Sequence, residues 1–153
     1  MSDCDLASVL QGVIGDLSVP IAERELQVDV RLADQARMLV SDPAKLHDVL
    51  RNLVENAVNY APEGGLVTVE AEREPQALVL RVLDNGPGIP LADISRVFER
   101  FYRVDKSRSR APGGTGIGLA IVKHLVELLG GTVTAGSRAE GGAVFTVRLP
   151  QPS

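Results

Sequence analysis

Residues 41–60 read SDPAKLHDVLRNLVENAVNY, and this stretch decides how the rest of the chain is interpreted. Ser41-Asp42-Pro43 is typical of a helix start, because a side chain that can cap a helix is followed by a proline at an early position. The apolar residues that follow fall on one side of a helix, namely Leu46, Val49, Leu50, Leu53 and Ala57. The stretch therefore predicts a long helix over about residues 43–60 with one buried face.

Towards the N-terminus, the sequence predicts one further helix and two strands. Residues 5–17 carry apolar side chains at helical spacing, and we expect this helix to end before Pro20. Residues 26–32 alternate apolar and polar side chains as a half-buried strand does. A short strand is expected at Met38–Val40, just before the long helix.

After the long helix, the pattern predicts four strands and one helix. The strands are expected around residues 67–71, 78–82, 132–137 and 143–149. The helix is expected at 116–129 and ends at Gly130-Gly131. Residues 84–114 lack regularity, and a loop of this length in a small domain is usually a functional lid. The mixed order of elements predicts an α/β chain folded as an α+β two-layer sandwich.

Composition limits the kind of protein. With 153 residues, 44% of them hydrophobic, we expect one folded domain over residues 1–153. The net charge of −4 disfavours nucleic-acid binding, which needs a basic surface. Cys4 is the single cysteine and cannot form an internal disulfide. No apolar run reaches the ~20 residues of a membrane span, so we expect a cytoplasmic segment without direct membrane contact.

Three polar residues follow one ridge of the predicted long helix. Asn52, Asn56 and Tyr60 are each four residues apart, so they lie one above another beside the buried face. Asparagine is a mediocre helix former, and two of them in mid-helix need a reason. A carboxamide offers an oxygen to a hard cation such as Mg²⁺ and N–H donors to phosphate. Polar residues on a partly exposed helix face remain the alternative.

Asp84 comes directly after the strand expected at 78–82 and begins the sequence Asp84-Asn85-Gly86-Pro87-Gly88. It continues the parity of the apolar residues in that strand, so its side chain should face the buried side. A buried carboxylate needs a hydrogen-bond donor. An adenine amino group is such a donor, whereas guanine has an acceptor there. Gly86 and Gly88 would let the backbone approach a flat ring, although a plain tight turn is the alternative.

Two further segments have compositions that suit phosphate. Gly113–Ala120 opens the helix expected at 116–129, where free N–H groups and the helix dipole favour an anion. It has neither the Lys-Ser/Thr of a P-loop nor the preceding strand of a dinucleotide site. Residues 98–110 are basic with aromatic residues at their start. They are interpreted as a solvated charge run, a nucleic-acid contact or a lid that reaches a terminal phosphate.

In their order along the chain, these four motifs resemble the N, G1, F and G2 boxes of the sensor histidine kinase catalytic domain. That domain belongs to the GHKL ATPase superfamily, which includes gyrase, the Hsp90 chaperone and MutL. The resemblance runs from about residue 5 to residue 149. Phe98–Arg103 and Gly113–Val122 look most similar to kinases of the phosphate-sensing subgroup. The resemblance implies a Bergerat-type ATP-binding fold, with a mixed sheet packed on one layer of helices.

The resemblance also implies a role for each motif residue. Those implied to bind the nucleotide are Asn56, Tyr60, Asp84, Gly86, Gly88, Thr115, Gly116 and Gly118. Asn56 would coordinate Mg²⁺, and Asn52 would support the metal and the phosphates. Residues 90–113 would form a lid from which Arg103 and Arg108 reach the γ-phosphate. The implied cofactors are ATP and Mg²⁺.

The implied reaction is phosphoryl transfer from ATP to a histidine on a separate dimerisation domain, with a response regulator served indirectly. His47 and His124 do not match the family's phosphoacceptor motif, so we expect the dimerisation domain to be absent here. The resemblance implies that the parent protein is a membrane-bound sensor. Asn52 stands where the hydrolytic branch of the superfamily places a glutamate general base. Asparagine cannot take up a proton in that way, so we expect hydrolysis slower than ~0.1 s⁻¹.

Two other functions stay open at this stage. One is an anti-sigma-type serine kinase of the same fold, although the long segment that begins at Phe98 favours the histidine kinase branch. The other is a module that binds nucleotide without transferring phosphate. The motifs indicate binding but cannot by themselves demonstrate transfer.

Overall fold

The computed structural model describes residues 1–99 and 118–152. Its elements in chain order are β1 (Ser2–Asp5), α1 (Leu6–Asp16), α2 (Ser18–Glu23), β2 (Gln27–Leu32), the 3₁₀ turn η1 (Asp34–Ala36), β3 (Met38–Ser41), α3 (Pro43–Tyr60), β4 (Leu66–Glu74), β5 (Ala77–Asp84), the 3₁₀ turn η2 (Leu91–Arg96), α4 (Gly118–Leu128), β6 (Thr132–Ser137) and β7 (Ala143–Pro150).

Helix α3 has the boundaries that its sequence predicts. Oδ1 of Asp42 accepts hydrogen bonds from the backbone N–H groups of Ala44 and Lys45, at 3.0 and 3.2 Å, and so caps the first turn. Pro43 occupies the first helical position, where its missing N–H leaves no bond unmade. The buried face comprises Leu46, Val49, Leu50, Leu53, Val54, Ala57 and Val58. The prediction of a helix over residues 43–60 is therefore confirmed.

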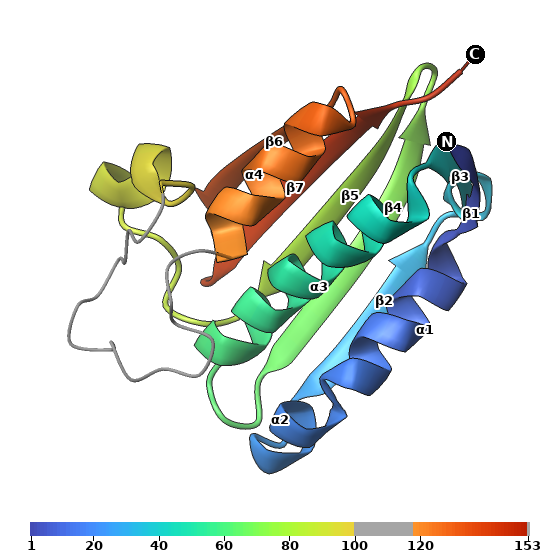
Figure 1. Cartoon of the computed structure of the whole chain (residues 1–153). Helices are drawn as coiled ribbons and strands as arrows, with labels where there is room; N and C mark the ends of the chain where they lie inside the picture. The colour runs from blue at the N-terminus through green and yellow to red at the C-terminus, as the bar shows by residue number, and fades with distance from the viewer. Residues whose placement is uncertain (100–117, 153) are drawn as a thin grey trace.

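The described part of the chain forms two layers. Five strands make a mixed sheet in the order β2-β4-β5-β7-β6, in which β2 and β4 run parallel and the other neighbours run antiparallel. Helices α1, α3 and α4 all cover the same face of this sheet (Figure 1). The expected mixed sheet on one layer of helices is confirmed.

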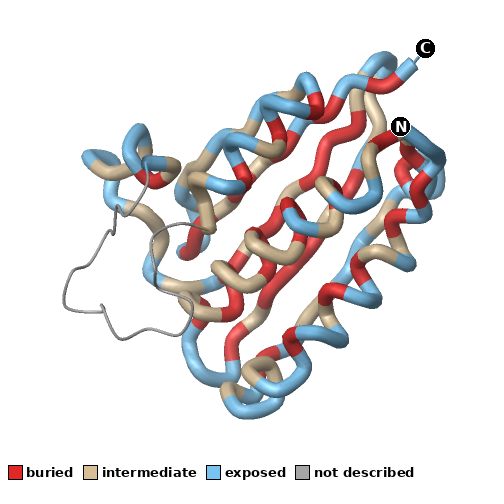
Figure 2. The backbone as a smooth tube through the Cα atoms, in the orientation of Figure 1, coloured by how far each residue is buried: buried red, intermediate tan, exposed pale blue. Residues whose placement is uncertain are grey.

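The core lies between these layers and is aliphatic. Alternate residues of β4 and β5 point towards the helices, and Val67, Val69, Leu78 and Leu80 are fully buried there. Phe145 of β7 is the aromatic member of this core, at 3% exposure. Figure 2 shows the buried positions along the strands and along the helix sides that face them.

Four elements differ from the predictions, one of them the short 3₁₀ turn η1 between β2 and β3, which was not predicted. The strand β1 was not predicted, and it pairs antiparallel with β3 in a separate two-stranded sheet. Helix α2 was also missed, because Pro20 was interpreted only as a sign that the first helix ends before it. Pro20 lies in the first turn of α2, where a proline has no intrahelical N–H bond to lose. Within the expected loop at 84–114, residues 91–96 form the turn η2.

Gln151 joins the small sheet to the end of the main one. Its side chain accepts a hydrogen bond from the Val40 N–H at 2.8 Å and donates to the Val40 carbonyl at 3.0 Å. The Gln151 amide thus bonds both the N–H and the carbonyl of Val40, as the backbone of a neighbouring β-strand would. Because Gln151 is buried and directly follows β7, it holds β3 beside the C-terminal end of that strand.

Candidate functional site

The candidate site centres on Asp84, the last residue of β5. Its side chain faces the helices and is 2% exposed, so the predicted burial is confirmed. Oδ1 accepts hydrogen bonds from the N–H groups of Gly86 and Ala143, at 2.8 and 3.4 Å. Among the described residues, no hydrogen bond reaches Oδ2. One carboxylate oxygen is therefore fixed by backbone donors, and the second can accept a bond from a ligand.

Burial raises the pKa of Asp84 above its ordinary value. The N–H groups of Gly86 and Ala143 and the charge of Arg138 act in the opposite direction, because they favour the ionised form. A carboxylate in this position gains from any further donor that replaces the water it has lost. The site thus suits a ligand that offers a hydrogen-bond donor.

Two glycines in the turn after Asp84 fit close to neighbouring elements. A side chain at Gly86 would overlap the carbonyl oxygen of Tyr60, at the end of α3. Gly88 has φ +80°, and a Cβ there would lie 3.2 Å from the Gly142 carbonyl oxygen. The two glycines let this turn sit between α3 and the β6–β7 connection. The predicted approach of their backbone to a flat ring stays a prediction.

The asparagine ridge of α3 faces the start of α4. Asn52 donates through Nδ2 to the Asp48 carbonyl at 2.8 Å, and its Oδ1 makes no hydrogen bond within the described residues. A Cβ placed on Gly118, the first residue of α4, would lie 3.1 Å from that Oδ1. Asn56 and Tyr60 are half-buried, and the Asn56 side chain makes no hydrogen bond within the described residues. The structure thus brings Asn52 and Gly118 together, with Asn56 free to bind a ligand.

Sequence reasoning missed the contribution of the β6–β7 connection. Ser137 accepts a bond from the Ile89 N–H at 3.0 Å and donates to the Ile89 carbonyl at 2.8 Å. Arg138 donates to the Asp84 carbonyl at 3.1 Å. Gly142 has φ +102°, and a side chain there would overlap the same carbonyl. The Gly141-Gly142 pair was the sequence signal for this turn, but nothing local indicates that it touches Asp84.

Several predicted site residues lie outside the described part of the chain. They are Arg103, Arg108, Thr115 and Gly116. Of the segment predicted as a lid, residues 90–113, only 90–99 are described. Val97 is 4% exposed, and the Phe98 ring meets that of Phe145 edge-to-face at 6.1 Å. The start of this segment is therefore anchored on the core.

The metal-ligand chemistry of the site is sparse. Within residues 1–99 and 118–152, no three His, Cys, Asp or Glu side chains are placed to hold a metal ion together. The carboxamide of Asn56 offers one hard oxygen donor. Such a donor fits Mg²⁺ only when phosphate oxygens and water complete the coordination.

Within residues 1–99 and 118–152, no helix has the length and apolarity to cross a membrane.

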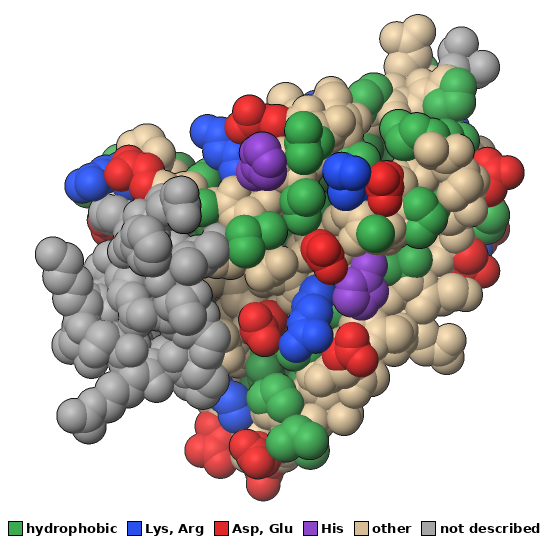
Figure 3. Space-filling model, viewed as in Figure 1, with side chains coloured by type: hydrophobic (Ala, Val, Ile, Leu, Met, Phe, Trp, Pro, Cys, Tyr) green, Lys and Arg blue, Asp and Glu red, His purple; other side chains and the backbone are tan. Residues whose placement is uncertain are grey.

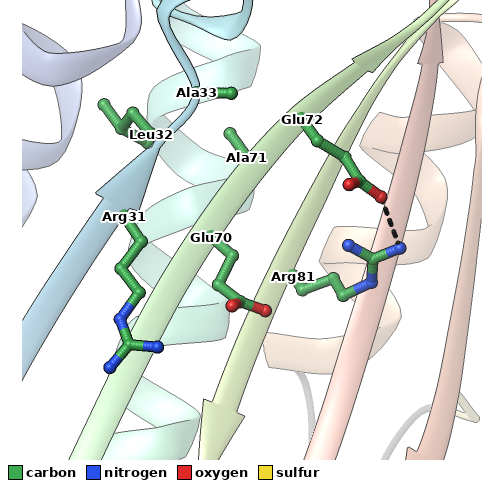
Figure 4. A pocket seen from close by; sticks show the side chains of 7 residues that line it. All are labelled: Arg31, Leu32, Ala33, Glu70, Ala71, Glu72 and Arg81. Atoms are coloured by element: carbon green, nitrogen blue, oxygen red, sulfur yellow. Dashed lines mark hydrogen bonds and ion pairs between the residues drawn. The ribbon is translucent and has the colours of Figure 1, made fainter.

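Other surfaces of the described chain do not assemble the predicted residues. On the helix-covered face, acidic and basic side chains are interspersed (Figure 3), and Arg51 lies 3.7 Å from Asp16 and 3.8 Å from Glu55. On the opposite sheet face, a shallow hollow is lined by Arg31, Leu32, Ala33, Glu70, Ala71, Glu72 and Arg81 (Figure 4). Arg81 and Glu72 pair there at 2.9 Å, and no predicted site residue lines the hollow.

The sequence matches a known family model over residues 41–153, described as histidine kinase-, DNA gyrase B- and HSP90-like ATPase. The sensor-like histidine kinase SenX3 of Mycobacterium tuberculosis is 39% identical over 150 residues, which cover 98% of this chain and 36% of that protein. The sensor histidine kinase WalK of Bacillus subtilis is 42% identical over 130 residues, which cover 84% of this chain and 21% of that protein. The chain thus spans about a third or less of these relatives.

Solved structures share the fold. The nucleotide-free catalytic domain of histidine kinase ThkA superposes with a TM-score of 0.85 at 23% identity, covering 98% of this chain and 95% of that one. The mycobacterial sensor histidine kinase MprB gives a TM-score of 0.82 at 27% identity, covering 98% and 97%. The two-layer arrangement around Asp84 is therefore one that occurs in histidine kinase catalytic domains.

Proposed function

Because the chain belongs to the histidine kinase-, DNA gyrase B- and HSP90-like ATPase family, we propose that it binds ATP with Mg²⁺ and supplies the γ-phosphate to a histidine on a separate dimerisation domain. In two-component signalling, that histidine passes the phosphoryl group to a response regulator. Residues 1–153 would act as a single catalytic domain in this scheme, and residues 90–113 would act as its lid.

The observation that carries the proposal is how the Asp84 carboxylate is hydrogen-bonded. One oxygen is held by two backbone N–H groups, and the other can accept from the adenine amino group. Guanine would present a carbonyl oxygen to the same carboxylate, and two acceptors repel. Gly86 and Gly88 have no side chains, so the backbone of this turn could approach the base closely. Asp84 would therefore both anchor and select the nucleotide base.

The triphosphate would extend from this pocket towards the start of α4. Asn52 lies beside Gly118, where the described part of α4 begins, and the N-terminus of a helix favours anions. Tyr60 would border the nucleotide, and Thr115 and Gly116 would continue the loop into the helix. Asn56 would hold Mg²⁺ together with the phosphates. Bound there, the ion would neutralise charge on the transferring phosphoryl group, with Arg103 and Arg108 as the cations of the lid.

The phosphoacceptor would come from another domain. His47 lies 3.2 Å from Asp48 and 3.7 Å from Asp16, within an exposed network between α1 and α3. His124 is exposed on α4. Neither histidine lies in the family's acceptor motif, so the chain would phosphorylate a histidine in trans.

A titration calorimetry experiment tests the proposal. We expect the chain to bind ATP, to bind it more tightly with Mg²⁺, and to discriminate against GTP. Asp84→Ala should lose the binding while it keeps its far-ultraviolet circular dichroism spectrum. Addition of a dimerisation domain with its acceptor histidine should then yield acid-labile phosphohistidine from labelled ATP. A folded wild-type chain that binds no adenine nucleotide would refute the proposal, and binding without transfer would favour a nucleotide-binding module.

A further inference from the structure

The connection between β6 and β7, taken with the strand residues at its two ends as residues 137–143, reaches the Asp84 turn from a distant part of the sequence. Ser137 exchanges two hydrogen bonds with Ile89, at 3.0 and 2.8 Å. Gly142 packs so closely on the Asp84 carbonyl that no side chain would fit there. The next residue, Ala143, donates to Asp84 Oδ1 at 3.4 Å. The connection therefore touches both the backbone and the carboxylate of the residue proposed to bind the base.

Arg138 is the charged member of this connection. Its guanidinium donates to the Asp84 carbonyl at 3.1 Å and to the Glu140 carboxylate at 2.9 Å. The Arg138 side chain is 25% exposed and Glu140 is 73% exposed, so the pair extends from solvent to the edge of the site. The backbone N–H of Arg138 also donates to the Gly142 carbonyl at 2.8 Å and closes the turn. One nitrogen of the guanidinium thus donates to the Glu140 carboxylate, and another donates to the Asp84 carbonyl.

We propose that Arg138 is a positioning residue for base recognition, which fixes the backbone of Asp84 so that its carboxylate faces the adenine amino group. This inference rests on the proposed function of Asp84. Arg138 would act through Asp84 and would not itself touch the nucleotide base.

The electrostatics of the site support this role. Burial raises the pKa of Asp84, and the positive charge of Arg138 lowers it. Within the described residues, Arg138 is the charged side chain that acts on Asp84, and its guanidinium also pairs with Glu140 at 2.9 Å. Loss of the guanidinium charge should therefore raise the pKa of Asp84 further. A protonated Asp84 is a poorer acceptor, so ATP binding should be lost at a higher pH than in the wild type.

Arg138→Gln removes the charge, and its shorter side chain gives up the hydrogen bond to the Asp84 carbonyl. We expect its ATP affinity at neutral pH to fall about 2- to 12-fold, the change that one hydrogen bond makes. The pH at which half of the binding is lost should rise. Arg138→Lys keeps the charge and should lie closer to the wild type on both measures. Arg148→Gln, which removes the exposed ion-pair partner that β7 offers to Glu74 of β4, is the matched control.

The experiment has two readouts. The pKa of Asp84 is measured without nucleotide by NMR titration of its labelled carboxyl carbon in the four proteins. ATP affinity is then measured across the same pH range by calorimetry. The inference predicts a raised Asp84 pKa and a shifted pH profile in Arg138→Gln, a smaller effect in Arg138→Lys and none in Arg148→Gln.

The two readouts separate the two proposals. Unchanged pKa and unchanged pH profile in Arg138→Gln would overturn the positioning role even if the wild type binds ATP well. An equal loss of affinity at every pH with an unchanged pKa would overturn the electrostatic coupling between Arg138 and the Asp84 carboxylate, and would leave only the hydrogen bond to the Asp84 carbonyl as the role of Arg138. If the pKa shifts but the wild type binds no ATP, the electrostatic coupling is real, while the proposed function and the role in base recognition both fail.

Discussion

Asp84→Asn changes the hydrogen-bonding character of the site with almost no change in shape. In the wild type, Oδ1 accepts from the N–H groups of Gly86 and Ala143. The asparagine oxygen must stay at that position, because a flipped carboxamide would set its NH₂ group against two N–H donors. The NH₂ group would then occupy the place of Oδ2 and face the base as a donor.

The size of the effect follows from the bond that is lost. A hydrogen bond to an ionised acceptor contributes about 1.5–3 kcal/mol, so ATP affinity should fall at least about 10-fold and up to about 150-fold. The opposed donors add to this loss. Guanine presents a carbonyl oxygen where adenine has its amino group. GTP should therefore bind Asp84→Asn about 2- to 12-fold better than it binds the wild type, as one neutral hydrogen bond allows.

Calorimetric titration with ATP and GTP at neutral pH measures both affinities. Glu70→Gln is the control, because it removes one carboxylate from the opposite face of the sheet. It should leave both affinities unchanged. The reasoning is refuted if Asp84→Asn binds ATP within twofold of the wild type, or if both nucleotides weaken equally, because then Oδ2 does not read the base.

Three further predictions concern the same region. Asn56→Ala should abolish the Mg²⁺ dependence of ATP binding in calorimetry. It should change the free energy of unfolding by less than ~0.5 kcal/mol, because the Asn56 side chain makes no hydrogen bond in the described residues. A large loss of stability would contradict this prediction. Gly142→Ala should destabilise the chain by about 1–3 kcal/mol in urea denaturation, because its Cβ would overlap the Asp84 carbonyl, whereas Gly12→Ala, with open space inside α1, should stabilise it. Because burial raises the pKa of Asp84 in the folded state, protonation stabilises the fold: this contribution is fully present below the unfolded-state pKa and is lost as pH rises through the folded-state pKa. Urea denaturation across that range should show this loss in the wild type and not in Asp84→Asn.

Much of the fold could be predicted because it depends on local patterns. The spacing of apolar residues in α3 defines a helix, and Asp42 and Pro43 define its start, whatever the rest of the chain does. Strand alternation placed Asp84 on the buried side of β5, and the structure confirms this. Helix α2 could not be predicted in the same way, because Pro20 excludes a helix interior but not a first turn.

The candidate site was predictable as a set of motifs but not as an arrangement. Asn52, Asp84 and Gly118 are identified by their local sequence. Their distances depend on how α3, β5 and α4 pack, and that packing is determined by the whole buried surface. Arg138 had no local signal at all, because it meets Asp84 across 54 residues of sequence.

The sequence by itself determined the long helix α3, the strands of the main sheet, the buried faces of these elements and the residue types able to bind a nucleotide, because hydrophobic period and side-chain chemistry are properties of neighbouring residues. The tertiary structure alone decided that β1 pairs with β3, that Gln151 holds β3, and that Ser137, Arg138 and Gly142 fix the Asp84 turn. These contacts join segments far apart in the chain, and they form because burial leaves each backbone and side-chain polar group in need of a partner.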